Sequence, residues 1–410
     1  MSPTLGLALL LASLLPAKGL LESHFSPAIH EGSRLTGRMA AKELARRNAD
    51  FGFRLLKKLS ANNPGKNIFL SPLSISTAFS MLCLGAEDST LAEIKKGLNF
   101  RKMPERDLHE GFHYLIHNLN RETQDVKMRI GNTLFMDQNF QPQRRFMTEA
   151  KNLYSAETIS ANFQNLEDTQ RQINDYVSQK THGKINNLIK QIDPGTVLLL
   201  TNYIFFQARW QHEFHPNATK EEDFILGRNS SVKVPMMSHE AVYTVGRDEE
   251  RACTILEMPF AQNLTAAFIL PDKGKLKRVE ASLQADVFAK WKTLLSKRVV
   301  RVSVPRLHIR GTLDLKKTLS SLGVTKIFEE RGDLTRISPH RSLKVGEAMH
   351  EAELIMDEKG TEAAAGSGAQ TLPMEAPLHL KINQPFLLMV YHSKLPAFLF
   401  LGRVFCPQTP

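Results

Sequence analysis

The stretch 357–376, DEKGTEAAAGSGAQTLPMEA, follows a well-patterned segment near the C-terminus and precedes an apolar run. It contains three consecutive alanines, three glycines and only two large apolar side chains, Leu372 and Met374. With the period of a β-strand, the odd positions from 361 to 371 carry only small uncharged side chains, and Glu362 lies on the opposite face. This alternation predicts a strand that fits a tightly packed sheet, although its glycines make it a poor strand alone. A Gly/Ala linker is the alternative that composition alone favours.

The length of 410 residues is compatible with several domains, but no linker interrupts the sequence pattern. Residues 3–20 form a short apolar run that ends in small residues, which predicts a cleaved secretory signal over 1–20. We expect an N-terminal extension over 21–44 and a single domain over 45–410. No other segment is apolar enough to span a bilayer, so no membrane insertion is expected.

Three sequons support the same secreted, extracellular location, and we expect glycans on Asn217, Asn229 and Asn263. The three cysteines are far apart in sequence, so they do not form a disulfide framework. Among them, Cys83 lies in an apolar context and is predicted to be a small buried side chain, whereas Cys406 is a reactive-thiol candidate. We expect the mature chain to be a monomer.

The formal net charge is +11, and the excess is concentrated in 273–301. In a secreted protein such a patch favours heparin, heparan sulfate or polyphosphate over nucleic acid, and no aromatic residues interleave with it. A solvated helix face is an equally good interpretation. The glycosaminoglycan candidates are Lys290, Lys292, Lys297 and Arg298, together with Lys184 from a second basic cluster. No other cofactor is indicated.

The hydrophobic periodicity predicts helices first and strands later. Helical patterns cover 38–60, 71–86 and 88–100, and a further one covers 167–192 with a break near Gly183. Strand patterns cover 196–210, 265–272, 298–307, 385–392 and 397–405. Without regular alternation of strand and helix, this order indicates an α+β fold with mostly antiparallel sheets.

One segment matches the sequence pattern of an enzyme motif. His109, Glu110 and His113 match H-E-x-x-H, and His117 extends the stripe by one turn. A zinc site needs a further ligand, and the glycine inside the motif weakens the helix. A solvated helix face is the better interpretation, and we assign no catalytic or metal-binding residue.

Several segments resemble one protein family. Residues 358–369, EKGTEAAAGSGA, resemble the hinge of inhibitory serpins. Further segments with the same resemblance are 67–86, 198–210, 268–276, 314–328, 343–364 and 385–404. The resemblance covers the chain from about residue 45 to its end.

The resemblance implies a fold and a mode of action. The fold is α+β, with three antiparallel-rich sheets, about eight to nine helices and an exposed reactive-centre loop at about 358–380. Such a protein is not an enzyme but a suicide substrate of a serine protease, which cuts the loop. The cut loop then enters the central sheet as a new strand.

The family pattern assigns the cut to the bond between Met374 and Glu375. The hinge residues that it implies are Glu358, Gly360, Thr361, Glu362, Ala363, Ala364 and Ala365. A charged or bulky side chain at position 361 would be buried by insertion at a cost of several kcal/mol, so the small threonine favours an inhibitor. The alternative is a non-inhibitory serpin that binds or carries another molecule.

Other positions carry over by motif. Ser71, Ser74, Asn202 and His350 match the family's shutter cluster beneath the central sheet, and Trp210 matches the breach where insertion begins. Independently of the family, the strand period places His350 on the same face as neighbouring apolar residues, so it should point inward.

The residue before the cut suggests the target. Met374 favours a protease with an apolar specificity pocket of chymotrypsin-like character, and Glu375 should exclude many proteases. The resemblance further suggests a kallikrein-type protease and an adipokine-type role in insulin action.

Overall fold

The computed structural model describes residues 27–120, 123–227, 229–339, 343–358, 376–395 and 397–407. The helices of these residues are α1 (Pro27–Asn62), α2 (Pro72–Cys83), α3 (Asp88–Gly97), α4 (Glu105–Leu119), α5 (Arg144–Tyr154), α6 (Leu166–Lys180), α7 (Leu276–Ser282), α8 (Ala285–Leu294) and α9 (Leu315–Ser320). Two short 3₁₀ turns, η1 (Pro216–Ala218) and η2 (Lys326–Phe328), complete them. No helix in these ranges is long and apolar enough to cross a membrane.

The strands form two sheets. They are β1 (Ile68–Leu70), β2 (Val126–Asp137), β3 (Glu157–Ala161), β4 (Leu198–Ala208), β5 (Lys220–Gly227), β6 (Ser230–Asp248), β7 (Cys253–Pro259), β8 (Leu264–Pro271), β9 (Ser296–Pro305), β10 (Leu307–Asp314), β11 (Glu347–Met356), β12 (Leu378–Lys381), β13 (Phe386–His392) and β14 (Phe398–Val404). The α+β class is therefore confirmed, as are all five strand patterns expected from the sequence.

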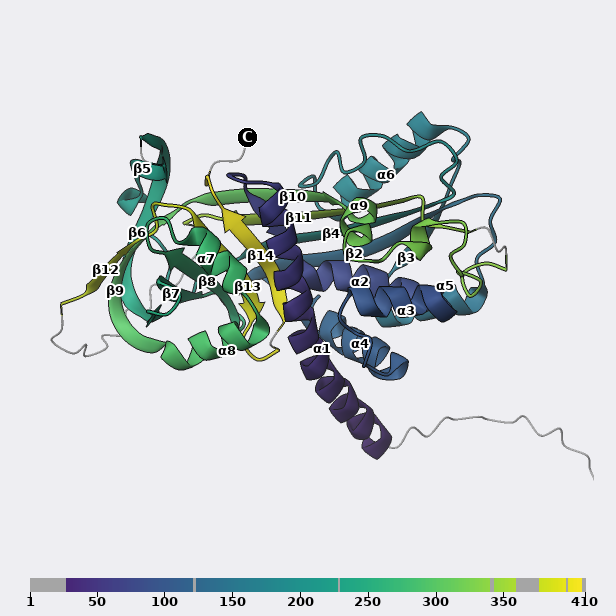
Figure 1. Ribbon diagram of the computed structural model, residues 1–410, viewed down its shortest axis with the longest axis horizontal. Coiled ribbons are helices and arrows are strands. Elements are labelled where there is room, and N and C mark those ends of the chain that lie inside the picture. The colour runs from purple at the N-terminus through teal and green to yellow at the C-terminus, as the bar shows by residue number, and fades with distance from the viewer. Residues whose placement is uncertain are drawn as a thin grey trace, which may run out of the picture.

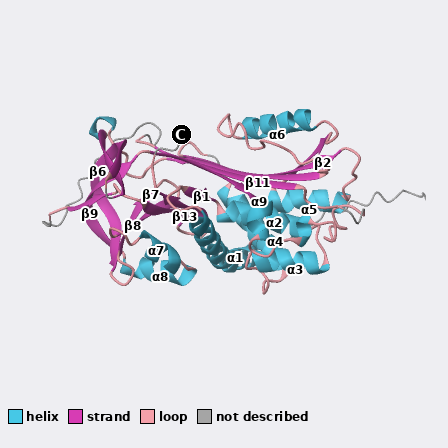
Figure 2. Ribbon diagram, turned by 45° about the horizontal axis from the view of Figure 1, so that its top comes forward, coloured by secondary structure: helices cyan, strands magenta, loops and turns pink. Residues whose placement is uncertain are grey.

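The central sheet has five strands in the order β10-β11-β4-β2-β3. The β11 and β4 strands are parallel, and each has an antiparallel neighbour on its other side. Helices α2 to α5 lie on one face of this sheet and α6 lies on the other (Figure 2). The two long strands β11 and β4 are thus enclosed in the middle of the molecule.

The second sheet has nine strands, in the order β1-β14-β13-β8-β7-β6-β9-β12 with β5 attached to β6. We expected three sheets, but the described residues form two. The reason is β6, a strand of 19 residues that pairs with β5 over 230–236, with β9 over 236–245 and with β7 over 244–248. One continuous strand therefore joins what would otherwise be two separate sheets (Figure 1).

The core explains the apolar run of β4, which is buried on both faces. Leu198, Leu200 and Ile204 belong to the main core below the sheet, whereas Leu199 and Tyr203 belong to a smaller cluster under α6. Because side chains alternate along a strand, a strand covered on both faces needs apolar residues at nearly every position.

Two expected boundaries differ from the structure. The helix α1 begins at Pro27 and runs through residues 44 and 45, and Ala40, Ala41 and Leu44 are buried in the main core. Residues 40–44, the last part of the expected extension, therefore pack with the domain. Likewise, the loop expected to reach about 380 ends earlier, because 378–381 form β12, which pairs in parallel with β9.

The prediction of a helix over 185–192 was wrong. After α6 the chain adopts left-handed conformations at His182 and Gly183, and no helix follows in 184–197. The segment is held instead by Asn174, whose side chain accepts a hydrogen bond from the Ile189 N–H and donates one to its carbonyl. Its apolar side chains are still buried under α6. The pattern therefore predicted their burial correctly but the backbone conformation wrongly.

Candidate functional site

The hinge begins at Glu358, two residues after the end of β11. Its carboxylate is 5% exposed and accepts hydrogen bonds from the Arg306 guanidinium at 2.6 and 3.0 Å and from the Thr219 hydroxyl at 2.5 Å. Burial opposes ionisation, but the hydrogen bonds from Arg306 and Thr219 outweigh it and lower the pKa of Glu358. The start of the hinge is thus anchored to β9–β10 and to the turn before β5.

Trp210 lies beside this anchor. Its indole N–H donates to the Asp357 carbonyl at 3.1 Å, and its ring stacks on Phe260 with centroids 4.1 Å apart. Phe214 packs edge-on against the same ring. Because the indole N–H bonds the backbone just before Glu358, Trp210 closes the end of the central sheet at which the chain leaves β11.

A row of polar side chains crosses the inner face in the middle of the same sheet. Asn132 of β2, Asn202 of β4 and His350 of β11 are register partners on three adjacent strands. The Asn202 amide donates to Asn132 Oδ1 and Ser74 Oγ, both at 2.7 Å. Ser71, the N-cap of α2, donates its backbone N–H to His350 Nε2 at 3.2 Å. Ser71, Ser74, Asn202 and His350 are therefore brought together, as expected.

The hydrogen bonds define the state of His350. Its Nε2 accepts from the Ser71 N–H, so Nδ1 carries the proton and donates to Asn202 Oδ1 at 2.6 Å. The ring is fully buried, and burial lowers its pKa to about 3. The imidazole is neutral at physiological pH and links β11, β4 and α2.

Asn132 is a member of this row that the sequence reasoning missed. It is 3% exposed and lies between Ile130 and Leu134, both of which face the same core. A polar amide in an apolar period-two face was the available signal, because a buried amide needs partners.

Other expected site residues lie outside the described part of the chain. These are Gly360, Thr361, Glu362, Ala363, Ala364 and Ala365 of the hinge, and Met374 and Glu375 of the expected cleavage site. Their assignments remain predictions from the sequence. The segment that contains them leaves the central sheet after β11 and rejoins the second sheet at β12.

The histidine motif on α4 does not form one solvated face. His109 is buried and its Nδ1 lies 2.5 Å from the Tyr154 hydroxyl, whereas His113 and His117 are exposed. The solvated-face expectation was therefore wrong for His109. No group of three or more His, Cys, Asp or Glu side chains that could hold a metal ion occurs among the described residues.

The basic candidates do not form one surface. The Lys292 ammonium contacts both carboxylate oxygens of Glu257, at 2.7 and 2.8 Å, and the Tyr391 hydroxyl, so its donors are used inside the fold. Lys290 pairs with Glu250 at 2.6 Å. Lys184 follows α6, on the side of the molecule opposite α8 (Figure 2).

Lys297 and Arg298 differ from the ion-paired candidates Lys290 and Lys292. Both are exposed at the start of β9 and form no ion pair within the ranges that the structure covers. Lys184 is half-buried and likewise forms no ion pair among the described residues, so these three candidates have unpaired charges, and only Lys297 and Arg298 adjoin each other.

The three sequon asparagines, Asn217, Asn229 and Asn263, are all exposed. Asn217 lies in η1, and its sequon threonine, Thr219, is the one that bonds Glu358. Asn263 has the left-handed conformation of a turn. Glycosylation at the three exposed asparagines stays a prediction.

The fold and the arrangement of hinge, tryptophan and polar row agree with the family comparison. A family model described as serpin, serine protease inhibitor, matches residues 46–407. The chain belongs to the serpin family, which is a family of protease inhibitors rather than enzymes.

Individual relatives give the same result. Human Serpin A12 is 69% identical over 99% of both chains, and pig alpha-1-antitrypsin is 39% identical over 90% of this chain and 88% of its own. Among solved structures, human thyroxine-binding globulin complexed with thyroxine matches with a TM-score of 0.85 at 35% identity. That match covers 90% of this chain and 100% of the globulin.

Proposed function

We propose that this protein inhibits a serine protease by being cut at Met374–Glu375 and then inserting the cut segment between β11 and β4. The observation that carries the proposal is the parallel pairing of these two central strands. A segment that turns back after β11 runs antiparallel to β11, and therefore also antiparallel to β4. Insertion would replace one parallel ladder by two antiparallel ladders, which are more stable per residue.

The length of the loop supports this account. Residues 361–371 would span about 35 Å as a strand at ~3.3 Å per residue, which matches the ten residues of β11. The small face of this segment would turn towards the core that β4 and β11 already cover. The protease, bound covalently to Met374, would be carried along the sheet and its active site distorted.

Opening the sheet requires two sets of contacts to change. The bond between His350 and Asn202 joins the two strands that must separate, and the anchor at Glu358 holds the end at which insertion begins. These contacts keep the uncut protein closed. Cleavage frees the segment that replaces them.

The target is argued from the residues at the cut. Met374 suits an apolar pocket, and Glu375 selects a protease with a basic residue close to the scissile bond. We propose a chymotrypsin-like or kallikrein-type target, secretion, glycosylation at the three sequons and an adipokine-type role. A sulfated glycan would bind at Lys297 and Arg298, because their charges are available.

A protease panel tests the proposal. The protein is mixed with chymotrypsin, a kallikrein-type protease and trypsin, and the products are separated under denaturing conditions. We expect an SDS-stable complex with one of the first two and a released peptide that begins at Glu375. Cleavage at another bond, or a complex with trypsin alone, would contradict the assignment.

A second candidate function is the binding of a small amphipathic anion, which a cavity of about 430 Å³ between α1 and α8 favours. Its walls include Phe288, Tyr391 and Phe398, and its rim carries Lys42 and Arg46. Apolar walls with a few polar groups are typical of ligand sites.

A fluorescent apolar anion, anilinonaphthalene sulfonate, tests this second function. Ala289→Trp would fill the cavity, whereas Ala218→Trp, outside it, is the control. Binding that the cavity variant abolishes and the control retains supports the function, and binding that both variants retain excludes this cavity.

A further inference from the structure

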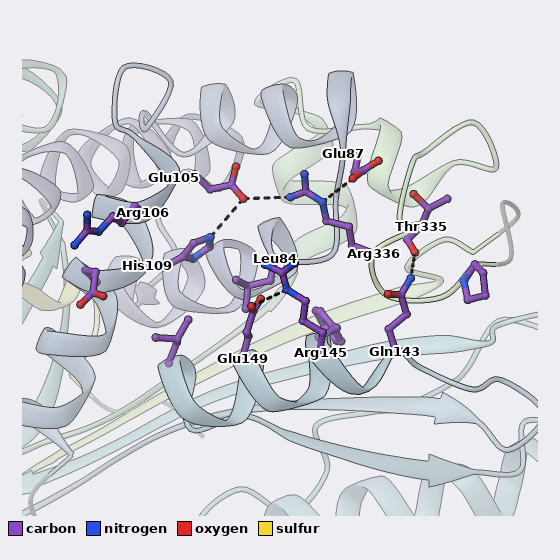
Figure 3. A pocket seen from close by; sticks show the side chains of 14 residues that line it. Leu84, Glu87, Glu105, Arg106, His109, Gln143, Arg145, Glu149, Thr335 and Arg336 are labelled. Atoms are coloured by element: carbon purple, nitrogen blue, oxygen red, sulfur yellow. Dashed lines mark hydrogen bonds and ion pairs between the residues drawn. The ribbon is translucent and has the colours of Figure 1, made fainter. Parts of the chain in front are cut away.

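A second, larger cavity lies between α4, α5 and the segment 335–339 (Figure 3). Its volume is about 1080 Å³, and its lining combines charged side chains with an apolar wall that includes Leu84, Phe146 and Leu153. It is distinct from the hinge, the polar row and the α1–α8 cavity, none of whose residues line it. No contact proposed for protease inhibition involves this cavity.

One lining side chain has an unused polar atom. His109 is 8% exposed, and its Nε2 has no hydrogen-bond partner among the described residues. The Glu105 Oε1 atom is 3.9 Å away, which is too long for a hydrogen bond. In Figure 3 the ring points from α4 into the cavity. Leaving a buried polar group unpaired costs free energy, so we expect this atom to form a hydrogen bond with a molecule bound in the cavity.

The other ring nitrogen decides what this partner must be. His109 Nδ1 lies 2.5 Å from the hydroxyl of Tyr154, which is 1% exposed. If Nδ1 carried the proton, the Tyr154 hydroxyl hydrogen and Nε2 would both be unpaired. If Tyr154 donates to Nδ1, only the Nε2 hydrogen is unpaired. The second arrangement loses fewer hydrogen bonds, so Nε2–H is a donor directed into the cavity.

The same tautomer disfavours a metal ion, because an imidazole nitrogen that carries a proton has no lone pair for a metal. Burial lowers the pKa of His109 to about 4, so the ring is neutral at physiological pH. The ligand must therefore offer an oxygen or another acceptor to a neutral N–H.

The charges around the cavity are mixed and largely paired. Arg336 bonds Glu87 at 2.7 Å and Glu105 at 3.3 Å, and Arg145 bonds Glu149 at 2.9 Å. An anion would meet these carboxylates and a cation would meet these guanidinium groups. Neither sign of charge has a clear electrostatic advantage in such a site.

Guanidinium groups present planar pairs of donors, and carboxylate groups present pairs of acceptors. A hydroxyl group can bond both kinds, because it both donates and accepts. Arg106 and Glu110 line the cavity without an ion pair within the described residues and add one group of each kind. The apolar wall offers a surface for the C–H face of a ring. We propose that this cavity is a binding site for a neutral saccharide, with His109 Nε2–H donating to one of its oxygens.

Binding of neutral disaccharides to the full-length protein tests the proposal. Maltose, lactose and trehalose are titrated by calorimetry, and inorganic phosphate, a sulfated disaccharide and Zn²⁺ are titrated in parallel. We expect one of the neutral sugars to bind and to raise the unfolding temperature. Its affinity should be unchanged by added salt, because no net charge is involved.

Matched variants locate the site. His109→Gln removes the imidazole donor, and His113→Gln, one turn further along α4 and exposed, is the control. Because His109→Gln also removes the partner of Tyr154, a second variant, Arg106→Ala with Arg145→Ala, changes only exposed wall residues. Both cavity variants should weaken sugar binding by about tenfold or more, and the control should not.

Three results would overturn the proposal. The first is that no neutral sugar binds, or that sugar binding survives in both cavity variants. The second is salt-dependent binding of phosphate or the sulfated sugar alone, which would make the cavity an anion site. The third is Zn²⁺ binding that His109→Gln abolishes, which would require the opposite tautomer.

Discussion

His350 and Asn202 connect β11 to β4 through a hydrogen bond of 2.6 Å in the middle of the central sheet. Both residues are fully buried, and the backbone of α2 completes their hydrogen bonds. A single pair of side chains therefore couples the two strands that must separate to the helix beneath them. Removing either side chain should therefore lower the stability of the protein by more than the loss of one hydrogen bond.

Replacing His350 by alanine tests this coupling. The change leaves the Ser71 N–H and Asn202 Oδ1 unpaired and opens a cavity, so the free energy of unfolding should fall by about 3 kcal/mol. Urea unfolding measures the effect. His379→Ala on β12 is the control, because His379 is exposed, and the two variants should differ clearly. Equal losses would contradict the role of the polar row.

The buried histidines also predict a pH dependence of stability. Burial lowers the pKa values of His350 to about 3 and of His109 to about 4, whereas an unfolded histidine titrates near ~6.5. Below the unfolded pKa, the unfolded chain binds more protons than the folded one, so stability falls as the pH falls from about 6.5 towards 4.

Each histidine should contribute a slope of up to about 1.4 kcal/mol per pH unit in that window. Unfolding curves between these pH values measure the slope for the native protein and for His350→Gln. The variant should be less stable at neutral pH but show a smaller slope. An unchanged slope would mean that His350 does not remain neutral in the folded state.

At the scale of elements, the end of β11 is held by Glu358 and Trp210 rather than by the ladder to β4, whose register ends at Leu354 and Phe206. The anchor therefore controls whether the strands separate from this end. The Arg306 side chain is 48% exposed, so water weakens its share of the anchor.

Glu358→Gln should loosen this end selectively. The loss of charge-assisted hydrogen bonds should cost about 1 to 2 kcal/mol, which is less than for a wholly buried pair. Hydrogen exchange should accelerate at 353–358 more than at 347–350. The control is Glu240→Gln, which breaks the exposed pair with Arg301 and should leave β11 unchanged. Uniform acceleration along β11 would contradict the anchor.

The sequence predicted elements well where one period dominated. The five strands followed from short apolar runs bounded by Pro, Gly or charged residues, and the inward face of His350 followed from the period of two. The segment 185–192 shows the limit. Its apolar spacing is helical, but Asn174 bonds its backbone and left-handed residues precede it, and neither fact is visible in a hydrophobic pattern.

The site was predictable in part for similar reasons. The four expected members of the polar row meet, yet the row also needed Asn132, which the residue-by-residue match did not include. The pairing of Lys292 with Glu257, 35 residues earlier in the chain, could not be expected from charge counting along the sequence. Long-range partners of charged groups depend on the register of distant strands.

At the scale of the whole molecule, the proposed function requires that the uncut form be less stable than the cut form. The central sheet now has a parallel pair at its middle, and insertion would add a strand there with ladders on both sides. In the uncut protein the intact loop cannot enter the sheet, so the native fold would lack this additional strand.

Thermal unfolding before and after cleavage of the loop tests this requirement. A protease that cuts within 361–374 without being trapped is used, and the cut protein is purified with both fragments. We expect the unfolding temperature to rise by more than about 10 °C, because a strand is added to the centre of the sheet. An unchanged or lower temperature would favour the carrier alternative.

The most direct test of the central claim is the stoichiometry of protease trapping by the native protein and by Thr361→Arg. The side chain at 361 would be buried on insertion, and an unpaired charge there would cost several kcal/mol. We predict an SDS-stable complex for the native protein, and cleavage without a complex for Thr361→Arg, with both proteins equally folded. Trapping by Thr361→Arg at full stoichiometry would contradict insertion of the cut segment between β11 and β4.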